Sequence, residues 1–274
     1  PFVENVSFHV GRGEIFGFLG PSGAGKSTIQ KILTGLNTSY KGSVKVAGTE
    51  IREHTNRFYE NIGVDFEFST CYEKFTARQN LAYFASLYDK QPRSIDELLH
   101  MVGLENDGDK KVADFSKGMR SRLNFIKALV HDPDILFLDE PTSGLDPVAR
   151  DELMNILADY ISDDNKSVLF STHITADLER IADYITILNN GKVWFTGTKD
   201  EIMEKYVILK GDENYLTENI KKKIIGFHSY KNGFEAMLPT EFLNELPEEI
   251  EYEKANIDEI LVYMSKEAAN ERNS

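Results

Sequence analysis

The sequence of 274 residues predicts an α/β protein built around a largely parallel sheet. Strand-like and helix-like segments alternate between residues 135 and 188, as they do when helices connect parallel strands. The wholly apolar run Ile135–Leu138 lies between Asp134 and Asp139, which is typical of a strand buried on both faces. A glycine-rich loop at residues 20–27 joins a strand pattern to a helix pattern, a unit that occurs in such folds.

The part before residue 70 is expected to be rich in strands. Val6, Phe8 and Val10 alternate with polar residues, which predicts a half-buried first strand. Further elements are expected in the order strand, helix, strand, strand, over residues 14–19, 26–36, 43–47 and 62–66. The glycine-rich loop follows the second of these strands directly, so it lies at a strand end.

The remainder of the chain has three parts: a helical stretch, a stretch of alternating strands and helices, and a C-terminal stretch with charge clusters. From residue 76 to about residue 130, apolar residues recur at helical spacing. After the buried strand we expect helix, strand, helix and strand over residues 149–161, 167–170, 176–182 and 184–188. Asn190–Gly191 then predicts a two-residue hairpin. Charge clusters and short apolar stretches follow, so we expect a main domain over residues 1–205 and a small α+β appendix over 206–274.

The composition excludes several classes of function. The chain carries 31 basic and 45 acidic residues, a net charge of −14, which argues against nucleic acid as a partner. Its single cysteine, Cys71, cannot form an internal disulfide and suits a reducing compartment. No apolar run approaches the roughly 20 residues that span a bilayer, and no signal-peptide pattern opens the chain. We therefore expect a cytoplasmic protein whose membrane role, if any, goes through a partner.

The glycine-rich loop has the pattern of a phosphate-binding loop. Residues 20–27, GPSGAGKS, match G-x-x-x-x-G-K-[ST] between a strand and a helix. Glycines let backbone N–H groups surround phosphates, and the helix N-terminus attracts the anion. Lys26 is expected at the β- and γ-phosphates and Ser27 on Mg²⁺. The candidate nucleotide-binding residues are Gly20, Pro21, Ser22, Gly23, Ala24, Gly25, Lys26, Ser27 and Thr28. A plain turn at a helix start is the alternative.

Two adjacent carboxylates follow the buried strand. In open α/β sheets the carboxyl ends of strands face the ligand crevice. Asp139 is therefore a candidate ligand of Mg²⁺, and Glu140 is a candidate general base for an attacking water. An ordinary solvated strand end is the alternative for this pair.

Three further segments carry a family resemblance. Residues 115–119, FSKGM, begin an amphipathic helix and resemble the signature loop of ATP-binding cassette (ABC) ATPases, usually LSGGQ. Residues 141–146, PTSGLD, resemble the D-loop of that family, and Thr172–His173 resembles its switch histidine. The order and spacing match over residues 2 to 205. The resemblance implies an ABC ATPase fold: a RecA-like core with a mixed or parallel sheet, an N-terminal antiparallel β subdomain and a helical subdomain at about 70–130.

The resemblance also implies roles for single residues. Ser116 and Gly118 would contact the γ-phosphate of ATP held by a second cassette, and Asp146 would lie at the interface between the two. His173 would contact the γ-phosphate in its own site and hold the catalytic geometry. The simpler alternatives are helix caps for Ser116 and Asp146, since both precede expected helices, and a structural role for His173.

The sequence departs from the family pattern at three places. The signature has Phe115, Lys117 and Met119 where leucine, glycine and glutamine are usual. Glu67 occupies the position of the Q-loop glutamine, where a carboxylate can face both the nucleotide and Mg²⁺. The aromatic residue that stacks on adenine in the family would lie upstream of Pro1.

The function implied by the resemblance is that of an ATP-binding and ATP-hydrolysing transporter subunit. The signature, Glu67 and the acidic tail resemble those of bacterial ABC-2-type exporters, and residues 258–266 resemble the closing helix of such subunits. The expected partners are a separate integral-membrane permease and a second cassette, identical or not, paired head to tail. The chain would then lie peripherally on the inner face of the cell membrane. A soluble ABC-family factor outside transport and an inactive binding module are the alternatives.

Overall fold

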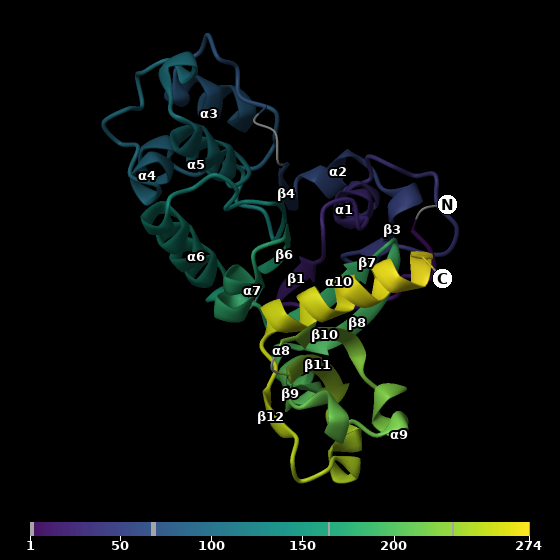
Figure 1. The fold of residues 1–274 in the computed structure, drawn as a ribbon. Coiled ribbons are helices and arrows are strands. Elements are labelled where there is room, and N and C mark those ends of the chain that lie inside the picture. The colour runs from purple at the N-terminus through teal and green to yellow at the C-terminus, as the bar shows by residue number, and fades with distance from the viewer. Residues whose placement is uncertain (1–2, 67–69, 164, 232, 274) are drawn as a thin grey trace. The chain divides into compact units, whose positions relative to one another are not determined.

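The computed structural model describes residues 3–66, 70–163, 165–231 and 233–273, and side chains as far as residue 265 (Figure 1). The chain forms two compact units, residues 1–194 and 195–274. The sequence places the domain boundary later, after residue 205, so the assignment of separate ATP-binding and accessory domains stays a prediction. No helix in the described ranges is long and apolar enough to cross a membrane.

A six-stranded sheet in the order β4-β5-β6-β1-β7-β8 forms the centre of the first unit. The strands are β1 (Ile15–Leu19), β4 (Ile62–Asp65), β5 (Ile135–Asp139), β6 (Ser167–Thr172), β7 (Tyr184–Asn189) and β8 (Lys192–Thr198). The pairs β4–β5, β5–β6, β6–β1 and β1–β7 are parallel, which confirms the predicted α/β fold. Asn190 and Gly191 both have positive φ, as the predicted hairpin between β7 and β8 requires.

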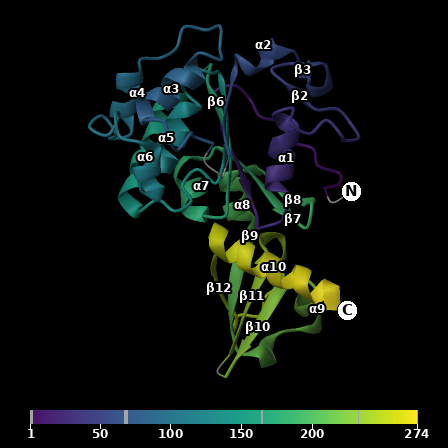
Figure 2. The same cartoon turned by 90° about the horizontal axis from the view of Figure 1, so that it is seen from above.

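Helices cover both faces of this sheet. Figures 1 and 2 show α1 (Lys26–Leu33) and α2 (Asn56–Tyr59) on one side, and α6 (Pro147–Ile161) and α7 (Thr175–Ile181) on the other. The predicted helical region consists of three helices in one group: α3 (Ala77–Ala85), α4 (Ile95–Met101) and α5 (Lys117–Lys127). Thr76 and Ser94 cap the first two through their side-chain oxygens, which explains where these helices begin.

The strand predicted near the N-terminus is not formed. Residues 3–10 make no strand, although Val6, Phe8 and Val10 pack partly buried on the core while their neighbours are exposed. Alternating burial requires only an extended backbone, whereas a strand also requires a neighbour in register. The antiparallel part of this region is the two-stranded sheet of β2 (Lys45–Val46) and β3 (Thr49–Glu50).

The second unit is an α+β unit, as predicted. Its antiparallel sheet has the order β10-β11-β9-β12. The strands are β9 (Tyr206–Gly211), β10 (Ile225–Tyr230), β11 (Gly233–Pro239) and β12 (Glu251–Lys254), and the helices are α8 (Lys199–Lys205), α9 (Glu218–Lys221) and α10 (Ile257–Asn273). Helix α10 packs on β10 and β11 (Figure 2). The core of the sheet contains Val207, Leu209 and Phe234.

His131 is a fully buried histidine that links the helical region to the sheet. Its Nε2 lies 2.9 Å from the carbonyl oxygen of Ile62 on β4. Its ring stacks on the ring of Tyr88, with the two ring centroids 3.6 Å apart. Its Nδ1 is buried without a hydrogen-bond partner in the described part of the chain. Burial disfavours the charged imidazolium and lowers the pKa of His131 from 6.5 to about 4.

This histidine predicts a loss of stability in mild acid. The unfolded chain binds the His131 proton below pH 6.5, whereas the folded chain binds it only near pH 4. The free energy of unfolding should therefore fall between these pH values, by about 3 kcal/mol from this group. Urea unfolding of the wild-type protein and of His131→Gln, measured from pH 7 to pH 4.5, isolates this contribution. Equal pH dependence in both proteins would contradict it.

Candidate nucleotide-binding site

The glycine-rich loop leaves the carboxyl end of β1 and enters α1. A Cβ at Gly20 would lie 2.2 Å from the carbonyl oxygen of Leu188, so the close approach of β7 excludes any side chain there. Gly23 and Gly25 have φ of +79° and +113°, which glycine adopts at little cost. The loop therefore turns into the start of α1, and its residues 21–23 are exposed.

The loop forms a pocket of about 530 Å³, a volume within the range of small-molecule sites. The pocket is lined by Pro21, Ser22, Gly23, Ala24, Gly25, Lys26, Ser27, Thr28, Glu140, Ser143 and His173. The fold thus brings the predicted loop together with both predicted catalytic residues. Of the predicted loop residues, only Gly20 is absent from the lining.

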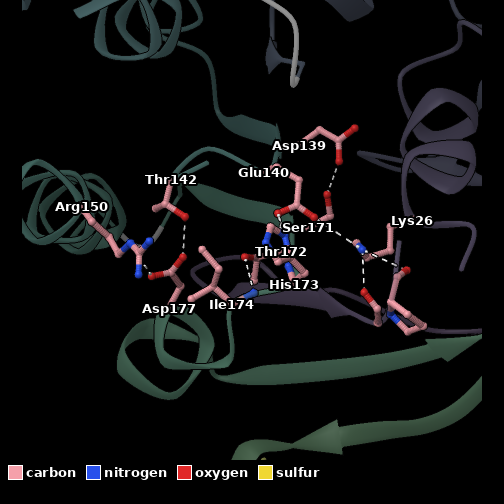
Figure 3. Close-up of polar contacts among 12 residues, drawn as sticks. Lys26, Asp139, Glu140, Thr142, Arg150, Ser171, Thr172, His173, Ile174 and Asp177 are labelled. Atoms are coloured by element: carbon pink, nitrogen blue, oxygen red, sulfur yellow. Dashed lines mark hydrogen bonds and ion pairs between the residues drawn. The ribbon is translucent and has the colours of Figure 1, made fainter. Parts of the chain in front are cut away.

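Lys26 is buried at the base of the pocket. Its Nζ donates to the carbonyl oxygen of Gly20 at 2.7 Å and to that of Pro21 at 3.4 Å, and it lies 3.5 Å from Oε1 of Glu140 (Figure 3). Carbonyl oxygens are weaker partners for an ammonium group than phosphate oxygens are. The lysine is therefore placed to exchange these contacts for a triphosphate, and the loop residues that line the pocket can offer backbone N–H groups to the same ligand.

Asp139 and Glu140 occupy different environments at the end of β5. Asp139 is buried, and its Oδ1 accepts a hydrogen bond from the hydroxyl of Ser171, its register partner on β6. Glu140 has φ of +55°, an uncommon value for a residue other than glycine, and this turns the chain out of the strand. The turn directs the Glu140 side chain into the pocket while Asp139 stays against the sheet.

His173 pairs directly with Glu140. Its Nδ1 lies 2.7 Å from Oε2 of Glu140, and its backbone N–H donates to the same oxygen at 3.2 Å (Figure 3). The imidazole is largely exposed, whereas the Glu140 side chain is only 12% exposed. The carboxylate thus lies between the Lys26 ammonium and the imidazole, and all three side chains line one pocket.

The residues present fit a bound Mg²⁺ ion. Among the described residues, no group of three or more His, Cys, Asp or Glu side chains could hold a metal by itself. Mg²⁺ in nucleotide sites is held by one or two protein oxygens together with phosphate oxygens. Ser27 lines the pocket, and Asp139 supplies a carboxylate at the adjoining strand end. When bound, the ion would neutralise charge on the phosphates.

The signature residues lie outside this pocket. Ser116 caps α5, because its side chain accepts a hydrogen bond from the N–H of Met119 at 3.2 Å. Asp146 caps α6 through Oδ1. Both residues therefore cap helices, as the simpler alternative held. These backbone hydrogen bonds hold the pKa of Asp146 below its usual value. A Cβ at Gly118 would meet only Leu145, at 3.9 Å, so packing within the chain does not require glycine there. Glu67 lies outside the described residues.

Several polar residues around the site were not predicted from the sequence. Ser143 lines the pocket, Ser171 holds Asp139, and Thr142 donates to Oδ2 of Asp177 at 2.5 Å. Burial raises the pKa of Asp177 above its ordinary value. The Ser171–Asp139 and Thr142–Asp177 contacts each join segments that are distant in sequence. Strand register would have revealed Ser171, because it lies opposite Asp139.

A glycine-rich loop with a buried lysine at a helix start, and a carboxylate pair at a strand end of the same parallel sheet, define a phosphate-loop nucleotide-binding protein. The chain matches the family model of the ABC transporter over residues 3–143. It therefore belongs to the ABC transporter family, and the predicted ABC ATPase fold is confirmed.

Relatives of the chain include ATP-binding proteins of export systems. The chain is 44% identical over 193 residues to a fluoroquinolones export ATP-binding protein of Mycobacterium tuberculosis, covering 70% of this chain and 64% of the relative. It is 39% identical to the Nod factor export ATP-binding protein I of Rhizobium meliloti, covering 70% of this chain and 58% of the relative. The chain thus spans somewhat less than two thirds of the length of these relatives.

Solved structures share the fold. An ATP-binding subunit of an ABC transporter superposes with a TM-score of 0.68 at 32% identity, covering 73% of this chain and 85% of the other. A dimeric ATP-binding cassette in a post-hydrolysis state with ADP and phosphate gives a TM-score of 0.66 at 25% identity, covering 72% and 90%.

Proposed function

We propose that this chain is the ATP-binding and ATP-hydrolysing subunit of an ABC transporter, of the ABC-2 exporter type. The observation that carries the proposal is the pocket in which the phosphate loop, Glu140 and His173 meet. The names of the relatives, which are export ATP-binding proteins, support the direction of transport. The transported substrate would be selected by the membrane partner.

In this proposal each pocket residue has a distinct task. Lys26 binds the β- and γ-phosphates, and Ser27 and Asp139 hold Mg²⁺. Glu140 accepts a proton from the water that attacks the γ-phosphorus as the bond to the ADP oxygen breaks. His173 contacts the γ-phosphate and keeps Glu140 in place. The existing Glu140–His173 contact of 2.7 Å supports this division of roles.

A complete site needs a second cassette. Ser116, Gly118 and Asp146 do not line the pocket of their own chain, and a Cβ at Gly118 would meet only Leu145, at 3.9 Å. We therefore propose head-to-tail pairing, in which the start of α5 closes over the ATP of the partner chain. Glu67, which precedes the helical region in the sequence, is proposed to sense the nucleotide and to signal to that region.

The helical region carries an exposed aromatic patch that suits a protein partner. Tyr72, Phe75 and Tyr83 are 40–47% exposed, and the Tyr72 ring contacts the rings of both others. Aromatic residues are enriched where proteins bind one another. We propose that this patch contacts an integral-membrane permease and so places the chain on the inner face of the membrane.

Co-purification with membranes tests the proposed function. Tagged protein, expressed in its native host and extracted in mild detergent, should retain a multi-span membrane protein. The double variant Tyr72→Ser/Tyr83→Ser should lose that partner, while Tyr215→Ser, equally exposed in the second unit, should keep it. Recovery of soluble complexes alone would favour the non-transport alternative and overturn the transporter assignment.

A further inference from the structure

A largely buried polar cluster of Thr142, Asp177 and Arg150 lies beside Glu140 and His173 and has no assigned task (Figure 3). The hydroxyl of Thr142, which is fully buried, donates to Oδ2 of Asp177 at 2.5 Å (Figure 3). Asp177 is 2% exposed, and its Oδ1 lies 3.9 Å from Nε of Arg150 on α6. That Nε is buried and has no hydrogen-bond partner in the described residues. A carboxylate is costly to bury, so its retention here calls for an explanation.

Two residues of the cluster lie close in the sequence to the two catalytic candidates. Thr142 follows Glu140 by two residues, and Asp177 follows His173 by four. The chain segments 140–142 and 173–177 are therefore joined twice, by Glu140–His173 at 2.7 Å and by Thr142–Asp177 at 2.5 Å. The two hydrogen bonds close a ring, and Figure 3 shows both bonds in one view.

We propose that Asp177 is a positioning residue that keeps His173 in register with Glu140 while ATP is bound and hydrolysed. The inference rests on the proposed roles of Glu140 and His173. In the structure His173 and Lys26 both engage the Glu140 carboxylate, and in the proposed function Lys26 exchanges its contact for phosphate while the His173 contact is kept. The Thr142–Asp177 bond lies outside the pocket lining, so it can persist during that exchange.

The same bond connects the catalytic pair to the proposed dimer interface. Thr142 belongs to the segment 141–146 that ends at Asp146, the cap of α6, and Arg150 lies one turn further along that helix. Contact of a partner cassette with this segment would therefore reach His173 through Thr142 and Asp177. In this arrangement, pairing of the two cassettes would set the position of the catalytic pair.

Steady-state ATPase measurements on purified full-length protein test the proposal. Asp177→Ala removes the acceptor, so kcat should fall at least about 10-fold, toward the 10²-fold loss that a displacement of about 1 Å can cause. KM for ATP should stay within about twofold, because the phosphate loop is untouched. Asp177→Asn keeps an oxygen for Thr142 and should recover most of kcat.

A surface ion pair between the same two helices supplies the matched control. Asp151 on α6 pairs with Arg180 on α7, and both side chains are more than one third exposed. Asp151→Asn should leave kcat and KM unchanged. All rates are expressed per ATP-binding site, counted by titration with a non-hydrolysable ATP analogue. A purely structural role for Asp177 would lower the number of such sites without lowering kcat per site.

Double-mutant cycles decide whether Asp177 acts through the proposed residues. Thr142→Val and Asp177→Ala should be non-additive in kcat, and Asp177→Ala should have little further effect in a His173→Ala background. Additive effects, or an unchanged kcat per site in Asp177→Ala, would overturn the inference. If Asp177→Ala does not fold, Thr142→Val carries the same test, alone and in the His173→Ala background. Full turnover in Glu140→Gln would instead contradict the proposed function.

Discussion

Replacing Lys26 with alanine is expected to abolish ATP hydrolysis, with a loss of at least about 10³-fold, and to weaken nucleotide binding. Lys26 is buried and lines the pocket, and no other lysine or arginine among the described residues does so. Removal of one preorganised donor to developing charge costs about 10²–10³-fold in other enzymes, and here a full positive charge is lost as well.

Phosphate release assays and binding of a fluorescent ATP analogue measure both effects. Lys31→Ala is the matched control, since Lys31 is an exposed lysine on the same helix and should be replaceable without effect. Thermal unfolding without nucleotide separates a folding defect from a binding defect. Near-normal hydrolysis by folded Lys26→Ala would contradict the assignment of the phosphate loop.

Glu140→Gln is expected to preserve ATP binding but to slow turnover by about 10²-fold or more, the scale of losing a positioned general base. Glutamine has the same shape and can still accept from the backbone N–H of His173, which now donates to Glu140 at 3.2 Å. It cannot take a proton from water at neutral pH. Glu152→Gln, an exposed change on α6, is the control and should hydrolyse ATP normally.

The slow Glu140→Gln variant should also reveal the dimer. With ATP and Mg²⁺ the variant should elute from a size-exclusion column as a dimer, because hydrolysis no longer separates the two chains. The dimer is a homodimer if the protein pairs with itself, and a heterodimer when a different partner cassette is added. Adding Gly118→Asp should abolish pairing, since a carboxylate near the γ-phosphate of the partner repels it. Open space around Gly118 lets the substituted chain fold. A monomer under all these conditions would argue against a shared site.

The sequence predicted the position of the glycine-rich loop between a strand and a helix because most of its geometry is local. The residues from Gly20 to Thr28 are consecutive, and glycine torsions together with the helix start suffice to shape them. Helix starts at Ser116 and Asp146 and the hairpin at Asn190–Gly191 are local in the same sense, so their side chains and torsions match the expectation.

Contacts between distant segments could not be predicted in this way. Ser171 and Asp139 meet because β5 and β6 pair in one particular register, and Thr142 and Asp177 meet because α7 packs beside the loop after β5. The apolar alternation near Val6 predicted burial correctly but not strand pairing, since pairing depends on an available neighbour.

The sequence by itself therefore determined the chemistry of this protein: a phosphate loop, a carboxylate pair at a strand end and the family to which these belong. Tertiary structure alone decided where the carboxylates lie and what they contact. It buried Asp139 against Ser171, and it turned Glu140 through a positive φ toward His173 and Lys26. The physical reason is that a motif specifies which groups are present, whereas strand register and helix packing specify which groups touch.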